Sequence, residues 1–291
     1  MKLSLRERYF PLCRPFYHRV KRWRGGGTVL HPQGKHHGKM LTRIDYNFDC
    51  PEHPEIAGKK FLFISDLHWN DSAKNRLIAA EITAIISEFR PDYLIFGGDQ
   101  CGDAETLDSL KPVLTAFAAM VPCALAVNGN WESGKDWIPA AFWQDFYRSC
   151  GIKHLFNQYY ADDFFLFSGV DDVSTGNCEL PLLPEQERKK FKVLLAHSPD
   201  TVIALDSVKS QMAAYSLALC GHTHGGQVRF FGPVRPRSRY GRRFDRGIMY
   251  HEAVDLHMLI SAGAGELSFP WRFNCRRDVA LINFTCGRKV Q

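Results

Sequence analysis

The chain of 291 residues is predicted to adopt an α/β fold. From residue 61 onward, short apolar runs that end at Gly, Asp, Asn or His alternate with amphipathic segments. Such runs are typical of buried strands, and the segments between them carry apolar residues at helical spacing. Connections of this kind place parallel strands in one sheet, and ligands then gather beyond the carboxyl ends of the strands.

The elements follow in a definite order. Helices are predicted over Lys74–Phe89 and Ala104–Met120, with another around Ala140–Arg148. The last three apolar runs have short connections instead of helices, which favours a second, partly antiparallel sheet. The predicted strands are Phe61–Ser65, Tyr93–Phe96, Ala124–Val127, Phe164–Ser168, Val193–Ala196, Ser216–Cys220, Val228–Phe231, Met258–Ser261 and Val279–Phe284.

We divide the chain into an N-terminal arm (1–27), a lead-in segment with a first strand (28–59) and one main domain (60–291). The arm carries eight Lys or Arg residues and one acid, a net charge of +7, so the rest of the chain is close to neutral within the total of +6. Aromatic and aliphatic residues alternate with these cations, and this mixture favours contact with an anionic membrane surface. A solvated tail, a segment packed on its own domain, or a nucleic-acid contact are the alternatives.

Cysteine content and hydropathy limit the cellular compartments in which the protein is expected. The nine cysteines form no C-x-x-C pair and are odd in number, which argues against a secreted disulfide framework and favours a reducing cytoplasm. Cys123 and Cys220 lie in apolar runs and are predicted to be buried. No run approaches the roughly 18 apolar residues of a membrane span. The predicted location is cytoplasmic, peripheral on the inner face of the membrane.

Five short clusters place metal-ligand residue types where predicted strands end. Each cluster alone has an ordinary explanation, because Asp caps helices, Asn occupies left-handed turns and an isolated His is usually structural. Together they supply the oxygen and nitrogen donors that hold a pair of divalent cations. The clusters are Asp66-Leu67-His68, Gly98-Asp99, Gly129-Asn130, Ala196-His197 and Gly221-His222-Thr223-His224.

The order of these clusters resembles the calcineurin-like metallophosphoesterases, over about residues 60–286. That resemblance implies an α/β fold with a four-layer α/β/β/α sandwich of two mixed sheets flanked by helices. The longer string from Gly221 to Val228 is similar to the YkuE and YaeI branch, together with the related chlamydial-type UDP-2,3-diacylglucosamine pyrophosphatase. Members of this branch are commonly membrane-associated. Further agreement comes from Gly169–Asp172, Tyr240–Arg243, Ser261–Gly265 and Pro270–Phe273.

The resemblance also implies the ligand set and the chemistry. Asp66, His68 and His224 would hold the first metal, Asn130, His197 and His222 the second, and Asp99 would bridge the two. The expected reaction is hydrolysis by a hydroxide between two cations, with no covalent enzyme intermediate. Manganese is the first choice of metal and iron or zinc the alternatives, since no thiolate is present. The residues expected to serve catalysis directly are Asp66, His68, Asp99, Asn130 and His197.

One position departs from the family pattern. Many members carry His directly after the Asn of the third cluster, where it assists the leaving oxygen, whereas this chain has Trp131. General acid assistance is worth about 10² to 10⁴ in rate, so its loss matters most for poor leaving groups. A pyrophosphate bond is therefore favoured over an alkyl diester, unless His68 or Glu132 compensates. Trp131 is equally well explained as a stacking or lipid-facing wall or as core packing.

A basic and aromatic segment follows the last cluster. Arginine matches phosphate oxygens with two parallel hydrogen bonds, so the segment is predicted to bind a diphosphate, a lipid headgroup or nucleic acid. A solvated charged loop is the alternative, but interleaved aromatic residues favour a lipid-linked phosphate. The predicted substrate contacts are Trp131, Arg229, Arg242, Arg243 and Arg272.

These observations predict a membrane-bound metallophosphoesterase that cleaves a phosphodiester or pyrophosphate bond. The candidate substrate is UDP-2,3-diacylglucosamine of the lipid A pathway, giving UMP and 2,3-diacylglucosamine 1-phosphate. A broad-specificity phosphodiesterase or nuclease is one alternative, and a non-catalytic scaffold of the same fold is another. The expected partners are a phosphorylated lipid or nucleotide-lipid and an anionic membrane, with nucleic acid second and no obligate protein partner.

Overall fold

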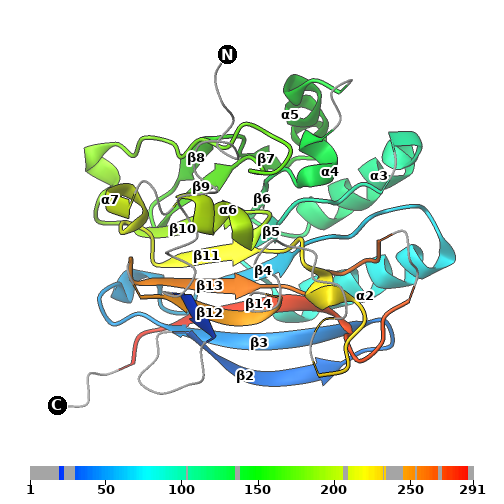
Figure 1. Ribbon diagram of the computed structural model, residues 1–291, viewed down its shortest axis with the longest axis horizontal. Coiled ribbons are helices and arrows are strands. Elements are labelled where there is room, and N and C mark those ends of the chain that lie inside the picture. Colours follow the sequence, from blue (N-terminus) through cyan, green and yellow to red (C-terminus); the bar gives the residue numbers. More distant parts are fainter. Residues whose placement is uncertain are drawn as a thin grey trace.

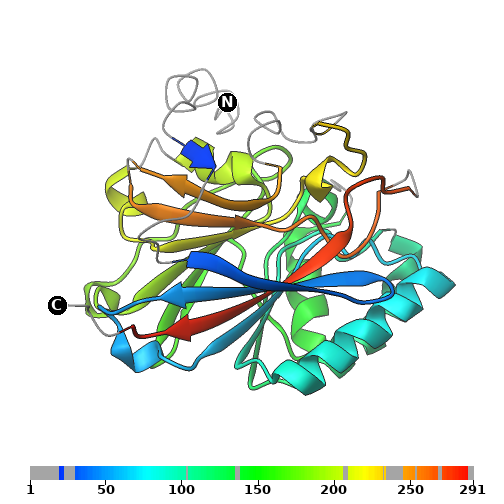
Figure 2. The same ribbon diagram turned by 90° about the horizontal axis from the view of Figure 1, so that it is seen from below.

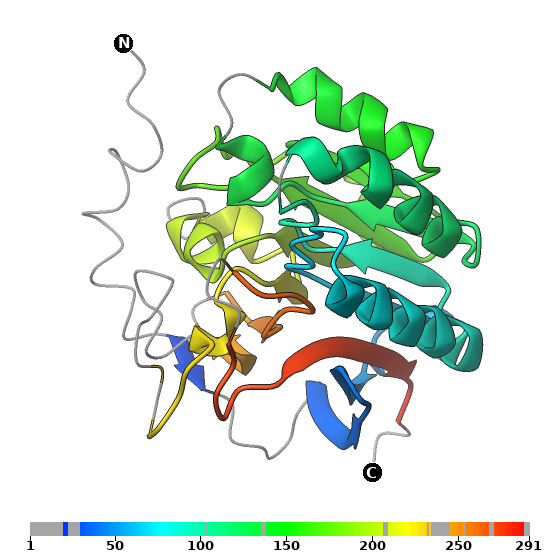
Figure 3. The same cartoon turned by 90° about the vertical axis from the view of Figure 1, so that its right-hand side faces the viewer.

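The computed structural model describes residues 20–22, 30–102, 104–134, 138–205, 209–231, 233, 245–252, 254–267 and 271–287. Within these ranges, fourteen strands form two sheets of seven that pack against each other (Figure 1). Helices cover the outer faces, with α2, α3 and α5 grouped on one side (Figure 3). This arrangement confirms the predicted α/β fold of two mixed sheets with flanking helices.

The first sheet has the order β2-β3-β14-β4-β5-β6-β7. Its strands β4 to β7 are parallel, because helices α2 (Ala73–Phe89), α3 (Leu107–Ala118) and α5 (Ala140–Ser149) return the chain between them. Strand β14 is parallel to β3 and antiparallel to β4. The strands are β2 (Leu30–His37), β3 (Leu41–Asp49), β4 (Lys60–Ile64), β5 (Tyr93–Phe96), β6 (Cys123–Ala126), β7 (Lys153–His154) and β14 (Arg277–Thr285).

The second sheet has the order β1-β12-β13-β11-β10-β9-β8. Its four central strands are parallel, and β8 and β12 are antiparallel to their neighbours. Helices α6 (Pro199–Ala204) and α7 (Lys209–Met212) pack on its outer face. The strands are β1 (Val20–Arg22), β8 (Gln158–Ala161), β9 (Phe165–Val170), β10 (Phe191–Ala196), β11 (Leu217–Cys220), β12 (Gly247–His251) and β13 (Leu256–Ile260).

Helix α2 shows how local sequence and packing agree. The Ser72 side chain caps its first turn by accepting a hydrogen bond from the Asn75 N–H, and Arg90 ends it in a left-handed conformation. Its buried residues Ile78, Ile82 and Ile86 recur every four positions and face the first sheet. The helix is thus held by one apolar stripe, as the sequence predicts.

Between the sheets lies a core rich in phenylalanine. Phe61 and Phe284 approach with ring centroids 4.6 Å apart, and Phe61 and Phe165 with centroids 4.8 Å apart. All three side chains are fully or almost fully buried. Such edge-to-face pairs add about 0.5–1.5 kcal/mol each to the free energy of apolar burial. This core fixes the two sheets, and with them the loops that leave their ends.

Three expectations need correction. Residues 28–59 supply two strands, β2 and β3, and β3 pairs with β14 along its whole length (Figure 2, blue and red). Val228–Phe231 does not form a strand, because Val228 and Arg229 make only isolated bridges to Phe273 and Pro233. The six predicted parallel strands also divide between two sheets, with three in each.

The arm and the cysteines can be followed only in part. Val20–Arg22 pairs with β12 at the edge of the second sheet, and the other arm residues lie outside the described ranges. The eight described cysteines are free; Cys123 and Cys220 are buried as predicted, and only Cys286 among the eight is exposed. None of the helices in the described ranges is long and apolar enough to span a bilayer.

Candidate metal centre

The structure brings together all seven predicted ligands from both sheets. Three of the five clusters follow β4, β5 and β6 of the first sheet, and two follow β10 and β11 of the second. The Nε2 atoms of His68 and His224, 156 positions apart in sequence, are 3.1 Å apart. The site therefore lies where the carboxyl ends of strands from both sheets meet.

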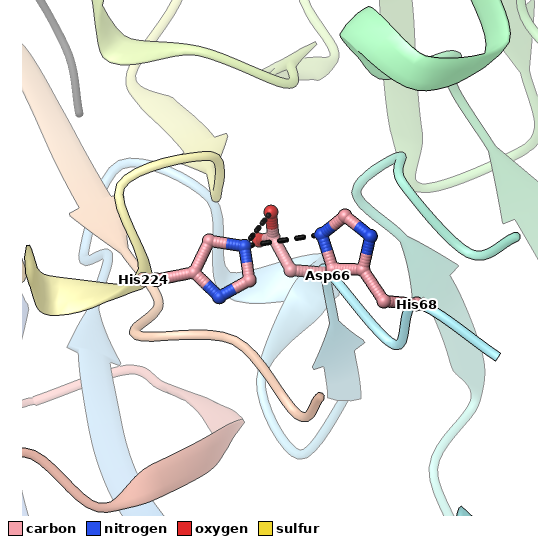
Figure 4. Close-up of side chains that lie close together, drawn as sticks. All are labelled: Asp66, His68 and His224. Atoms are coloured by element: carbon pink, nitrogen blue, oxygen red, sulfur yellow. Dashed lines mark hydrogen bonds and ion pairs between the residues drawn. The ribbon is translucent and has the colours of Figure 1, made fainter. Parts of the chain in front are cut away.

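One group of ligand atoms comes from Asp66, His68 and His224, whose side chains point toward one another (Figure 4). The Oδ1 atom of Asp66 is 3.2 Å from Nε2 of His224. All three residues are buried, and one ligand atom from each lies within 4.8 Å of the others. Two facing imidazole nitrogens beside a carboxylate oxygen, shut off from water, form a donor set that fits a divalent cation.

A second group adjoins the first and comprises Asp66, Asp99 and His197. The Nε2 atom of His197 lies 3.4 Å from Oδ2 of Asp99 and 3.2 Å from Oδ1 of Asn130. The same Asn130 oxygen lies 2.7 Å from Nδ1 of His222. The predicted ligands of the second metal thus surround one point, and these two groups have the composition of a two-metal site.

Asp99 lies between the two groups. Its Oδ2 atom is 3.6 Å from Nε2 of His68 and 3.4 Å from Nε2 of His197. Its other oxygen, Oδ1, accepts a hydrogen bond of 2.8 Å from the backbone N–H of Trp131. One carboxylate oxygen therefore faces both groups, which is the position that the predicted bridging ligand requires.

The site holds its residues in the protonation states that bind cations. Burial by itself raises the pKa of Asp66, but His224, His197 and His68 outweigh it and hold that pKa well below its usual value. The pKa of Asp99 falls to about 2, since His197 outweighs the same effect of burial. Burial lowers the pKa of His68, and that of His224 to about 4. At neutral pH both carboxylates are ionised and these two imidazoles are neutral, as metal ligands must be.

His197 shows that a positive charge is favoured at the second group. Its Nδ1 atom lies 2.7 Å from the carbonyl oxygen of Gly97, to which it donates, so Nε2 faces the carboxylates. Burial lowers the pKa of His197, yet Asp99 reverses that effect and raises the pKa well above its usual value. Without a cation, a proton on the ring offsets the negative charge of Asp99, and a metal ion would take over that role.

The backbone of the site is strained at five of the seven ligands. Asp66, His68, Asp99, His222 and His224 have φ values of 54°, 43°, 53°, 69° and 50°, all in the left-handed region. Residues other than glycine adopt this region at a cost of about 1–3 kcal/mol each. The surrounding core must hold these turns in place. The sequence offers no direct signal for this feature beyond the position of the ligands at strand exits.

The glycines that precede Asp99, Asn130 and His222 permit close approach of the surrounding chain. A Cβ atom on Gly129 would overlap the Asp99 carboxylate, and one on Gly221 would overlap the side chains of Ser65 and Asp66. Neither of these glycines has a positive φ, so space rather than conformation requires the absence of a side chain. Gly98 has both constraints, with a φ of 89° and the Gly129 backbone against it.

Gly221→Ala is expected to weaken metal binding and to lower stability by about 1–3 kcal/mol, because the new methyl group displaces Asp66. Metal analysis and thermal unfolding measure the two effects. Gly34→Ala is the control, since a Cβ atom there would meet nothing closer than 3.6 Å. Equal metal content in the two variants would contradict the packing argument.

Glu132 is a buried support that the sequence did not reveal in this role. Its carboxylate accepts 2.9 Å hydrogen bonds from the backbone N–H groups of Asp99, Gln100 and Gly129. Burial, and then the nearby Asp99 charge, raise its pKa to about 7. Because both oxygens bind backbone groups, Glu132 joins the loops after β5 and β6 instead of replacing the missing histidine. The one sequence feature that could have indicated this role is the position of Glu132 two residues after the ligand Asn130.

The predicted substrate residues lie in different surroundings. Trp131 lines a cavity together with His68, and their ring centroids are 6.3 Å apart. Arg229 pairs with Asp245 and donates to the carbonyl oxygen of Gly225. Arg272 lies behind the metal centre, with Nη2 3.2 Å from Nδ1 of His224. The remaining two, Arg242 and Arg243, lie outside the described residues.

The family model described as the calcineurin-like phosphoesterase superfamily domain matches residues 60–234, more than half of the chain. This protein therefore belongs to the calcineurin-like phosphoesterase superfamily, as its motifs predict. Together with the buried Asp and His groups, this membership identifies it as a metal-dependent phosphoesterase.

Several known proteins are similar to this chain. The chain is 29% identical to Phosphodiesterase YaeI of Escherichia coli over 235 residues, which cover 77% of this chain and 81% of the relative. It is 26% identical to the uncharacterized metallophosphoesterase YkuE of Bacillus subtilis, over 77% of this chain and 78% of the relative. A crystal structure of a dimetal phosphatase from Danio rerio is 11% identical over 72% of this chain and 88% of that chain, with a TM-score of 0.43.

Proposed function

We propose that this protein hydrolyses a phosphodiester or pyrophosphate bond in a lipid-linked substrate at a membrane surface. UDP-2,3-diacylglucosamine is the candidate, with UMP and 2,3-diacylglucosamine 1-phosphate as products. Within this proposal the protein acts in the cytoplasm, on the inner face of the membrane. The observation that carries the proposal is a patch of exposed aromatic side chains on the segments that follow the metal ligands.

This aromatic patch comprises Phe230, Phe231, Trp271 and Phe273. More than half of each side chain is exposed; Phe273 is the least exposed at 54%. The tilted rings of Phe230 and Phe273 have centroids 5.3 Å apart, and backbone hydrogen bonds join Gln227 and Arg229 to Phe273. Exposed aromatic clusters mark interaction surfaces, and aromatic rings prefer the headgroup region of a bilayer. The patch begins at Phe230, six residues after His224, so a lipid held there would be near the metals.

A cavity of about 430 Å³ adjoins the metal centre on the side of His68 and Trp131. Its wall includes polar side chains at the start of α2, notably Asn70, Ser72 and Lys74. Lys74 is paired with Glu266 at 2.8 Å. This metal-side cavity is large enough to hold the part of a substrate attached to the reacting phosphorus. Its mixed lining suits a sugar or nucleotide better than an acyl chain.

The chain's own residues have distinct parts in the proposed reaction. A pair of cations at the centre would lower the pKa of a bound water and stabilise charge on phosphoryl oxygens. Asp66, Asp99 and the ligand histidines hold that centre, and Glu132 keeps its loops in register. Trp131 lines the metal-side cavity where a histidine is common in the family, and indole supplies no acid. A leaving group that needs no proton, such as the phosphate of a pyrophosphate, fits this arrangement.

A second candidate function is a phosphodiesterase of broad specificity, which the printed name of the YaeI relative favours. Nucleic acid would then be a further possible substrate, and cationic residues near the site would follow its backbone. A non-catalytic scaffold is the least supported alternative, because the ligand set is complete. The substrate panel below separates the first two functions.

The test compares UDP-2,3-diacylglucosamine, cyclic nucleotides, nucleic acid and an aryl phosphodiester with purified protein and Mn²⁺. We expect UMP release from the lipid substrate to have the largest kcat/KM. Trp271→Ser should raise KM for the lipid substrate in mixed micelles and leave the soluble aryl diester unaffected. Leu182→Ser is the matched control, since Leu182 is 81% exposed and outside the aromatic patch. Efficient cleavage of aryl diesters with the lipid substrate left intact would overturn the proposed substrate.

A further inference from the structure

A second cavity, of about 450 Å³, lies behind the metal centre between the edges of the two sheets. Its wall is formed by β2, β3, the residue before β12 and the segment that leads into β14. The volume lies within the range of about 300–1,000 Å³ that is usual for small-molecule sites. We call it the cationic cavity; its charged and polar lining includes Lys35, Lys39, Arg246, Arg272, Arg276 and Arg277.

The charge of the cationic cavity is poorly balanced. Among the residues that the structure describes, six Lys or Arg side chains line it, and Asp278 is the only carboxylate on its wall. That carboxylate is buried and accepts hydrogen bonds from the Ser261 hydroxyl and the Ala262 N–H, at 2.6 and 2.9 Å. In the described part of the chain, no carboxylate pairs with Lys35, Lys39, Arg246 or Arg276. Of the six cations, only Arg277 has a carboxylate as an ion-pair partner in the described residues, Glu266, so the wall carries an excess of positive charge.

Two buried guanidinium donors in the wall have no acceptor. The Nε atoms of Arg272 and Arg277 are shut off from solvent and have no hydrogen-bond partner in the described residues. Their terminal nitrogens do have partners, backbone carbonyls for Arg272 and Glu266 for Arg277. A buried donor without an acceptor is destabilising, and more so when it is charged. Because both Nε atoms are shut off from solvent, they do not face the open cavity, and the excess of Lys and Arg on its wall is the main indication that an anion belongs there.

We propose that the cationic cavity binds a phosphate-bearing anion, as a site separate from the metal pair. Arginine side chains recognise phosphate oxygens with two parallel hydrogen bonds, and lysines add point charges. The site goes beyond the proposed hydrolysis, because it contains no ligand of either metal group. Arg272 nevertheless connects the two, since it lines the cavity and lies 3.2 Å from His224. An occupant would therefore contact the residue that supports the first metal group.

Two sources can supply this chemistry. A free phosphate or diphosphate would enter from solvent past Lys35 and Lys39, which are both exposed. The headgroup of an anionic lipid would come from the membrane, because the wall segment also carries Trp271 and Phe273 of the aromatic patch. The two sources share one recognition chemistry, and two arms of one experiment distinguish them.

The first arm measures inorganic pyrophosphate binding by calorimetry, with the full chain freed of metal by a chelator so that the metal pair cannot bind the anion. We expect one saturable site in the wild type. The double variant Lys35→Glu, Lys39→Glu should bind at least about tenfold more weakly, because two attractive charges become repulsive. The matched control is Lys111→Glu, Lys189→Glu, which makes the same change in net charge at exposed residues outside the cavity.

The second arm measures co-sedimentation with phosphatidylcholine vesicles, with and without phosphatidylglycerol. Loss of the phosphatidylglycerol-dependent fraction in the cavity variant alone would assign the site to a lipid headgroup. Unchanged sedimentation together with weakened pyrophosphate binding would assign it to a free phosphate. The proposal fails if the wild type binds no pyrophosphate saturably, or if both double variants weaken binding equally. Neither binding measurement depends on catalysis. If the proposed hydrolysis proved wrong, the outcome of these two measurements would still decide the proposal for the cationic cavity.

Discussion

Asp99→Ala is expected to lower kcat/KM for any phosphoester substrate by roughly 10³-fold or more and to reduce bound metal below two ions per chain. One oxygen of Asp99 faces both ligand groups, at 3.6 Å from His68 and 3.4 Å from His197. Its removal takes a negative charge from both groups at once. Metal assistance contributes several kcal/mol of transition-state stabilisation, and each 1.36 kcal/mol corresponds to about tenfold in rate. Metal analysis and steady-state kinetics measure the two effects.

Asp163→Ala serves as the control for Asp99→Ala, since Asp163 is exposed and outside both ligand groups. It should retain wild-type metal content and activity. Asp99→Ala should also keep its fold, because both sheets are held by cores that do not include Asp99. Full activity with two bound metals in Asp99→Ala would show that the site is not assembled as the geometry indicates.

Glu132→Ala is expected to destabilise the protein by about 3–6 kcal/mol and to disorder the metal centre. Its carboxylate satisfies three buried backbone N–H groups, of Asp99, Gln100 and Gly129. Each buried donor left without an acceptor costs about 1–3 kcal/mol, and the total is a large part of the 5–15 kcal/mol that holds a typical domain together. Thermal and denaturant unfolding measure the loss.

Glu132→Gln separates the loss of acceptors from the loss of volume. The amide keeps the shape of the side chain, but only its oxygen can accept a hydrogen bond. We expect the free energy of unfolding of Glu132→Gln to lie between the values for the wild type and Glu132→Ala, together with weaker metal binding. Glu185→Ala is the control, because that side chain is 81% exposed. If Glu132→Ala unfolds at the same temperature as Glu185→Ala, Glu132 is not the support that its contacts indicate.

The local pattern of apolar residues was sufficient to predict the helices and strands that bury one or both of their faces. The runs that became β4, β5, β6, β9, β10 and β11 are almost entirely apolar, and α2 has apolar residues at every fourth position. These signals depend only on neighbouring residues and on the fixed periods of strands and helices. Strands β2 and β8 were missed, because these edge strands are partly exposed and lack a continuous apolar run. Strand β12 was also missed, although it lies between β1 and β13 and is mostly buried. Strand β2 also contains Pro32 and Gly34 and shifts register between them.

The sequence by itself determined the α/β class, the superfamily and the residue types that can hold two metals. Only the tertiary structure decided that the five clusters leave two different sheets and meet at one edge, with β3 paired to β14 about 236 positions away. It alone also produced the left-handed ligand turns, the triple hydrogen bonding of Glu132 and the cationic cavity. The physical reason is sequence separation, because periodicity depends only on residues that are near each other in the chain. A ligand site, a buried acceptor and a cavity are made by residues that only packing brings together.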